Sequence, residues 1–259
     1  MLVEVPHAGL AVPELVRQQV VASDWAILRD ADPYVDQLYG GAPTEGATLL
    51  CAKVSRYVVD LNRAPDDVDA ETVPDHPSPR AMQPRGVVWR MTTDGRPALR
   101  EPLTYSELER RLETFHRPYH AALREQLERL RERFGFAIMV AGHSMPSIGR
   151  SGHSDSGVRR ADIVPGTRGR TTADARLIDL ADSHFRAAGL TVRHDDPYRG
   201  GWSTGHYGRP AECWHAIQIE VNRALYMNET TGGTLAEPMA RMRTLLRELL
   251  AKLGKLTLR

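Results

Sequence analysis

The feature that most constrains the fold is an uninterrupted apolar run, Phe136-Ala137-Ile138-Met139-Val140-Ala141-Gly142, which is followed at once by His143. A strand with one face in solvent alternates apolar and polar residues, whereas a strand covered on both faces reads as a continuous apolar run. Such strands belong to parallel or mixed sheets that carry helices on their faces. The run therefore predicts a central strand that ends at His143.

The rest of the chain alternates between strand-like and helical segments. We expect strands at residues 2–5, 47–54, 57–61, 190–192 and 213–221, and helices at residues 14–21, 34–39, 104–134, 172–188 and 239–253. This alternation predicts an α/β fold with a mixed, mostly parallel central sheet flanked by helices. Because the sequence has no internal repeat and no low-complexity tract, we expect a single domain over residues 1–259.

The longest expected helix has clear boundaries. Thr104 and Glu107 form a capping box at its start, and Gly135 supplies its C-terminal stop. Pro118 lies inside this segment and lacks a backbone donor, so it predicts a kink.

Periodicity disappears between residues 64 and 102, where seven of the 17 prolines fall. An irregular connection of this length in a compact domain is either a functional lid or mobile insertion, or a disordered surface loop. Both interpretations stay open from the sequence.

Composition excludes several classes of function. The 259 residues hold 34 lysines and arginines against 33 aspartates and glutamates, which leaves no basic excess to follow a phosphate backbone. The longest apolar stretch is far shorter than the roughly 20 residues of a membrane helix, and residues 1–6 lack the features of a signal peptide. We expect a cytoplasmic protein that binds neither nucleic acid nor membranes, and the oligomeric state is open.

Two histidines follow strand-like runs directly. His7 comes after residues 2–5, and His143 comes after the central apolar run. The carboxyl ends of neighbouring strands form the ligand crevice of an open α/β sheet. Two imidazoles there suggest a metal, with Asp32 or Asp36 as the third ligand of a catalytic zinc site. Taken singly, each histidine is more often a hydrogen-bonded structural residue, and the position that the two share favours the functional interpretation.

A carboxylate also falls within the strand expected at residues 213–221. Alternation places Glu220 with Gln218 and Trp214, on the face opposite Ile217 and Ile219. A buried charge is costly unless it is paired or used. Glu220 is therefore either a general base with a raised pKa or one half of a buried ion pair with Arg223 or Arg63.

The segment Asp60-Leu61-Asn62-Arg63 ends another expected strand with a guanidinium group. The planar fork of an arginine can hold a substrate carboxylate through two hydrogen bonds. Arg63 is therefore a candidate for substrate binding.

Together these residues resemble the N-formylglutamate amidohydrolase family over nearly the whole chain. The segments that carry the resemblance are Pro6-His7-Ala8-Gly9, Asp32-x-x-x-Asp36-Gln37-Leu38-Tyr39, Ser55-Arg56-Tyr57-Val58-Val59-Asp60-Leu61-Asn62-Arg63, Gly142-His143-Ser144, Tyr198-Arg199-Gly200-Gly201-Trp202-Ser203-Thr204-Gly205-His206-Tyr207-Gly208-Arg209-Pro210 and Ile217-Gln218-Ile219-Glu220. That family is similar in turn to zinc carboxypeptidases and aspartoacylase-like deacylases, in which a His-x-x-Glu pair and a distant histidine bind zinc.

The resemblance implies a zinc-carboxypeptidase-like fold and a set of site residues. It implies ligation of zinc, or another divalent metal, by His7 and His143, carboxylate recognition by Asn62 and Arg63, and general-base action by Glu220. Leu10 stands where the His-x-x-Glu pair would have its glutamate. The middle ligand must therefore come from elsewhere, with Asp32 as the first choice and Asp36 as the second.

The implied reaction is hydrolysis of N-formyl-L-glutamate, a small molecule, to formate and glutamate. Because glutamate carries two carboxylates, a second anchor is needed, and Arg209 with nearby His206 is a candidate. Gly205, Gly208 and Pro210 around these two residues fit a structural turn as well. Two other functions stay open, namely a related zinc deacylase or small-peptide hydrolase and a non-catalytic carboxylate-binding protein.

Overall fold

The protein is described by a computed structural model that covers residues 1–82 and 85–258. Its centre is a five-stranded sheet with the order β2-β1-β3-β5-β4. The strands are β1 (Leu2–Val5), β2 (Thr48–Cys51), β3 (Ala137–Met145), β4 (Ile163–Gly166) and β5 (Trp214–Asn222). Four strands run parallel and β4 is antiparallel to β5, so the predicted mixed, mostly parallel α/β sheet is confirmed.

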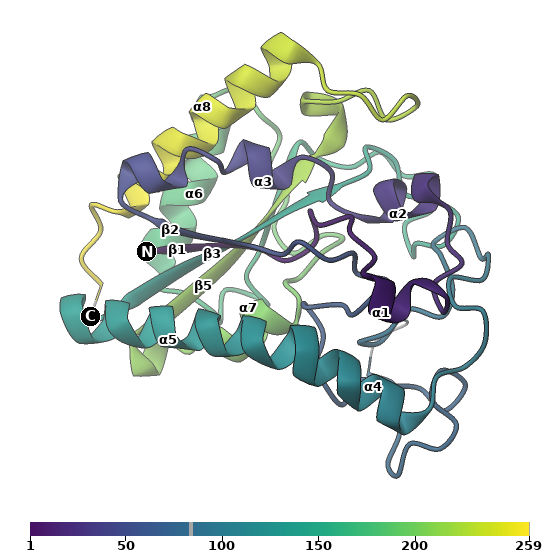
Figure 1. The fold of residues 1–259 in the computed structure, drawn as a ribbon. Coiled ribbons are helices and arrows are strands. Elements are labelled where there is room, and N and C mark those ends of the chain that lie inside the picture. Colours follow the sequence, from purple (N-terminus) through teal and green to yellow (C-terminus); the bar gives the residue numbers. More distant parts are fainter. Residues whose placement is uncertain (83–84, 259) are drawn as a thin grey trace.

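Helices cover both faces of the sheet (Figure 1). The helices are α1 (Glu14–Arg17), α2 (Asp24–Asp30), α3 (Val35–Leu38), α4 (Tyr105–Arg111), α5 (Arg117–Phe134), α6 (Ala175–Ala187), α7 (Trp202–Tyr207) and α8 (Ala236–Leu253). Residues of α3, α6 and α8 pack with one face of β1, β3 and β5, while α5 and α7 pack on the other face. Among the described residues, no helix is long and apolar enough to cross a membrane.

The apolar run of residues 136–142 forms most of the central strand β3, as predicted. Every residue of β3 and of β5 is buried, because both strands lie inside the sheet and are covered on both faces. β3 extends beyond the predicted end at His143 and finishes at Met145, since it pairs with β5 over its whole length.

The segment from residue 105 to 134 is helical throughout, with the predicted capping box at its N-cap Thr104 and a left-handed Gly135 at its end. A π-helical turn, Leu112–His116, lies just before Pro118 and separates α4 from α5. The regular pattern of helical backbone hydrogen bonds is therefore disturbed ahead of the proline. Pro118 itself occupies the first turn of α5, where its missing backbone donor costs little.

Several local predictions were wrong. The helix expected at residues 14–21 ends at Arg17, α2 and α7 were missed, and residues 190–192 contribute a single bridge from Val192 to Ile163. Strand β4 was also missed, because a proline such as Pro165 argues against a strand. Pro165 is tolerated here because β4 lies at the edge of the sheet.

The strand predicted at residues 57–61 is instead a set of buried turns. Arg111 Nη1 donates to the carbonyl oxygens of Tyr57 (3.3 Å) and Val58 (2.9 Å), and His120 Nε2 donates to that of Leu61 (2.9 Å). Side chains from α4 and α5 thus satisfy carbonyls that a strand would pair with a neighbouring strand. The apolar side chains of this segment suited burial, but its backbone partners are not visible in the local sequence.

Arg111 is fully buried, and burial lowers its pKa to about 10, which still leaves it charged near neutral pH. We expect Arg111→Met to lower the free energy of unfolding by about 2–4 kcal/mol, because two buried carbonyls lose their donor. Urea denaturation measures this loss. The matched control Arg110→Met changes an exposed neighbour and should cost less than about 0.5 kcal/mol. Equal losses in the two variants would contradict the proposed role of Arg111.

Candidate active site

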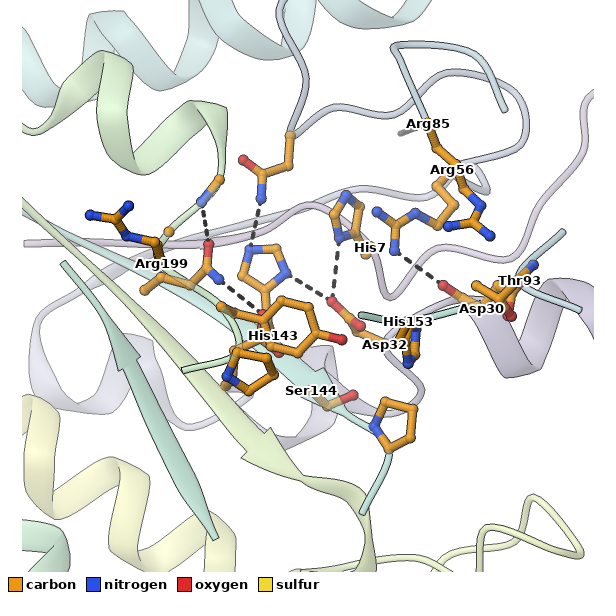
Figure 2. Close-up of a pocket in the computed structure, with 18 of the residues that line it drawn as sticks. His7, Asp30, Asp32, Arg56, Arg85, Thr93, His143, Ser144, His153 and Arg199 are labelled. Carbon is orange, nitrogen blue, oxygen red and sulfur yellow. Dashed lines mark hydrogen bonds and ion pairs between the residues drawn. The ribbon is translucent and has the colours of Figure 1, made fainter. Parts of the chain in front are cut away.

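A cavity of about 610 Å³ lies at the carboxyl ends of β1, β3 and β5. Figure 2 shows its lining, which includes His7, Asp32 and His143. His7 follows β1, and His143 lies near the end of the neighbouring strand β3. The sheet thus brings together two histidines that are far apart in the sequence, as the pattern of strand ends predicted.

His7, Asp32 and His143 are buried, and each offers one ligand atom within 4.8 Å of the others. Asp32 reaches this position because its backbone N donates to the carbonyl oxygen of His7 at 2.9 Å. Its Oδ2 lies 2.9 Å from His143 Nδ1 and 3.4 Å from His7 Nδ1 (Figure 2). Burial alone would raise the pKa of Asp32, but the hydrogen bond with His143 and the nearby imidazole of His7 lower it.

This group could hold a metal ion. His7 Nδ1 is buried and has no hydrogen-bond partner among the described residues, although it faces a carboxylate oxygen. Two imidazole nitrogens and a carboxylate oxygen are a donor set typical of zinc. Asp36, the second choice for the middle ligand, is half-buried in α3 and does not line the cavity.

Asp60 holds His7 of the His7, Asp32 and His143 group in place through hydrogen bonds. It is fully buried, and its Oδ1 accepts from His7 Nε2 (2.7 Å) and from the backbone N of Asn62 (2.9 Å). Its Oδ2 accepts from Arg56 Nη2 (2.6 Å) and from Trp89 Nε1 (3.0 Å). Burial opposes ionisation, but Arg56 and then His7 hold the pKa of Asp60 well below its usual range. The carboxylate therefore fixes the ring of His7 with Nδ1 toward Asp32.

Asn62 is buried beside His143. Its Oδ1 accepts from the backbone N of Ser203 at 2.9 Å, and its Nδ2 lies 3.3 Å from His143 Nε2. Gly201 gives the amide its space, because a Cβ there would lie 2.2 Å from Asn62 Nδ2. Asn62 therefore orients His143, and its amide is occupied by protein partners.

Arg63 lines the cavity. Its Nε donates to the carbonyl oxygen of Arg85 and its Nη1 to that of Asn62, each at 2.9 Å. These bonds fix the guanidinium and leave Nη2 without a hydrogen-bond partner within the described part of the chain.

Glu220 lies opposite His143 in the register of β3 and β5 and also lines the cavity. It is 6% exposed, and its Oε1 accepts from Gln218 Nε2 at 2.9 Å. Burial, with a smaller contribution from Asp32, raises the pKa of Glu220 to about 7. Across residues 1–82 and 85–258, no ion pair joins Glu220 to Arg223 or Arg63, and Arg223 pairs with Asp32 instead. The buried ion pair considered from the sequence is therefore absent.

The structure does not bring His206 and Arg209 to the cavity. His206 stacks on Trp202 with 4.4 Å between ring centroids, and Arg209 pairs with Glu212 at 3.0 Å. His206 lies in the last turn of α7, and Arg209 lies just beyond its C-cap Gly208. Arg209 is therefore not among the residues that line this cavity, and its role as a second substrate anchor stays a prediction.

Sequence reasoning missed most of the positive charge in the cavity. The arginines that line it are Arg29, Arg56, Arg63, Arg85, Arg150, Arg168, Arg199 and Arg223. Most of them lie on loops, where no periodicity marks a side chain as inward-facing. Arg56 and Arg199 stand in the quoted family segments, which was the available signal.

The site thus combines buried imidazoles and carboxylates with a cation-rich cavity at the strand ends of an α/β sheet. The chain belongs to the N-formylglutamate amidohydrolase family, whose sequence model matches residues 1–227.

Two relatives are both named N-formylglutamate deformylase. The protein of Pseudomonas putida is 36% identical over 97% of this chain and 92% of its own length. That of Pseudomonas aeruginosa is 33% identical over 98% of this chain and 92% of its own length.

Solved structures share this fold. The N-formylglutamate amidohydrolase of Ralstonia eutropha JMP134 superposes with a TM-score of 0.89 and 34% identity, over 99% of this chain and 93% of that one. A gene product of Agrobacterium tumefaciens shares the fold, with a TM-score of 0.70, 23% identity and coverage of 98% of this chain and 89% of that one.

Asp60 provides a test of the site's scaffold. We expect Asp60→Asn to lower the free energy of unfolding by about 3–5 kcal/mol, because it leaves the guanidinium of Arg56 without its buried partner. Chemical denaturation measures the loss. The control Asp66→Asn removes an exposed ion pair with Arg80 and should cost less than about 1 kcal/mol. A small loss in both variants would mean that Asp60 does not organise these loops.

Proposed function

We propose that this protein is a metal-dependent amidohydrolase that cleaves N-formyl-L-glutamate to formate and glutamate. The observation that carries the proposal is the pairing of Glu220 with His143 on adjacent strands, which sets a buried carboxylate beside the His7, Asp32 and His143 group. Relatives named N-formylglutamate deformylase, similar over nearly the whole chain, support the substrate.

His7, Asp32 and His143 would hold zinc or another divalent ion, and the unpartnered His7 Nδ1 fits that role. Such an ion polarises an amide carbonyl and makes water acidic enough to react near neutral pH. Asp60 orients His7, and Asn62 orients His143.

Glu220 is the proposed general base. It accepts a proton from the attacking water and passes it to the amide nitrogen as the C–N bond breaks, which yields formate and the free amine of glutamate. A carboxyl group with a pKa raised to about 7 suits both proton transfers near neutral pH. Arg63 Nη2 is available for a substrate carboxylate, and its fixed guanidinium keeps that donor in place.

A substrate panel tests the reaction itself. Formyl, acetyl and succinyl derivatives of glutamate should separate a deformylase from a broader deacylase, with formylglutamate cleaved at the highest kcat/KM. Cleavage of small peptides at a comparable rate, or no hydrolysis at all by metal-loaded protein, would contradict the proposal.

Two matched carboxylate variants test metal binding. We expect Asp32→Asn to lose most bound divalent metal, because the neutral amide is a poor ligand, while Asp36→Asn keeps the wild-type content. Elemental analysis after dialysis gives the metal content, and circular dichroism controls for folding. Equal metal content in a folded Asp32→Asn variant would remove Asp32 from the ligand set.

Glu220→Gln keeps the shape of the side chain and removes its basicity. We expect kcat for N-formylglutamate to fall by about 10²- to 10⁴-fold while metal content and folding stay near normal. Steady-state kinetics measures the fall. A folded, metal-loaded variant with the wild-type kcat would return Glu220 to a structural role.

A further inference from the structure

The turn Thr167 to Arg170 has an unusual backbone at the edge of the cavity. Arg168, Gly169 and Arg170 all have positive φ angles, of 51°, 76° and 65°. Residues with a side chain rarely adopt this conformation, and it is found where a precise geometry is required. Arg168 also lines the cavity.

Asp195 holds this turn. Its Oδ1 accepts from the backbone N of Thr167 (2.7 Å) and of Arg168 (3.1 Å), and its Oδ2 accepts from that of Gly169 (2.7 Å). Three backbone N–H groups of the turn therefore donate to the single carboxylate of Asp195. This arrangement fixes the direction in which the side chain of Arg168 leaves the backbone.

The side chain of Arg168 packs against glycines of the segment that contains α7. A Cβ at Gly205 would lie 3.1 Å from both Cδ and Nε of Arg168, and one at Gly200 would lie 3.4 Å from Cγ. Nη1 donates to the carbonyl oxygen of Gly200 at 3.3 Å. The missing side chains at these glycines make room for the guanidinium to reach the cavity.

Arg168 differs from most arginines of the cavity in its partners. Arg29, Arg56, Arg150 and Arg223 each pair with an aspartate. Arg168 has no acidic partner among the described residues. Its charge is therefore available to an anionic ligand.

The other cavity arginines without an acidic partner in the described ranges lie differently. Arg85 stands near the ring of Trp89, 5.2 Å from its centroid, and Figure 2 shows Arg85 beside Arg56. Arg199 lies across the His7, Asp32 and His143 group from that pair in the same view. The turn held by Asp195 approaches the cavity on the side of Arg199, because Arg168 N donates to the carbonyl oxygen of Arg199 at 2.8 Å.

We propose that Arg168 binds the second carboxylate of a dicarboxylic substrate and that Asp195 is the positioning residue for Arg168. This proposal rests on the proposed function, and it names the group that selects glutamate over neutral side chains. Arg63 and Arg168 then hold the two carboxylates from different loops. The assignment replaces Arg209, which lies outside the cavity.

The test compares N-formyl-L-glutamate with N-formyl-L-glutamine, which differ in the charge of one group. We expect Arg168→Gln to reduce the preference for the glutamate derivative, as the ratio of the two kcat/KM values, by about 10- to 100-fold. The loss should appear as a raised KM for the glutamate derivative. An unchanged ratio, or an equal loss with both substrates, would overturn the proposal.

Arg170→Gln is the matched control. Arg170 belongs to the same left-handed turn, but its guanidinium pairs with Asp179 at 2.7 Å and does not line the cavity. This variant should keep the wild-type ratio. A change as large as that of Arg168→Gln would mean that the turn, and not the guanidinium of Arg168, determines the preference.

Asp195→Asn tests positioning. The amide can accept at one atom only, so the turn should relax and the substrate preference should fall as in Arg168→Gln. The double variant should show no further loss. A wild-type preference in Asp195→Asn, or additive losses in the double variant, would remove Asp195 from this role.

Binding of the products separates this proposal from the proposed reaction. Calorimetry should show tighter binding of L-glutamate than of L-glutamine to the wild-type protein, and Arg168→Gln should remove that difference. This result stands even if the protein hydrolyses no formyl amide, in which case the proposed function alone fails. Equal affinities for both amino acids in the wild-type protein would overturn the role of Arg168.

Discussion

The buried carboxylate of Asp60 is the interaction on which the rest of the site depends. An ionised group with no solvent contact costs several kcal/mol unless its lone pairs are filled. Asp60 fills them with donors from separate segments, namely His7 after β1, Arg56, the backbone N of Asn62, and Trp89 from the irregular segment. The requirement to satisfy one charge thus brings together the loops that carry a proposed metal ligand, the residue that orients His143, and a wall of the cavity.

A second buried carboxylate supports the other side of the site. Glu4 in β1 is fully buried, and burial raises its pKa to about 7. Its Oε1 accepts from Ser203 Oγ at 2.9 Å, while the backbone N of Ser203 donates to Asn62, whose amide lies beside His143. The start of α7 is therefore tied both to the sheet and to the amide that orients His143. Glu4, which is buried in β1, thus influences a site that forms at the strand ends.

The sequence predicted those parts of the site that the sheet positions, and it failed where distant side chains decide the geometry. The run before His143 and the alternation around Glu220 follow from burial of β3 and β5, which a local pattern records. The turns at residues 57–61 depend on Arg111, more than 50 positions away, which no local pattern records. Arg209 shows the same limit, because the glycines and the proline around it indicate a turn without showing that Arg209 pairs with Glu212.

The segment from residue 64 to 102 explains how a cavity wall can form without regular structure. No helix or strand is present in its described part, yet Val87 and Trp89 are buried in a core with Tyr57 and Val59. Backbone hydrogen bonds reinforce this packing, since Asp60 N donates to the carbonyl oxygen of Val87 at 2.7 Å. Such a wall is held by individual contacts, so its lining can change without altering the sheet. Side chains placed by strand register and arginines placed on loops can therefore vary independently.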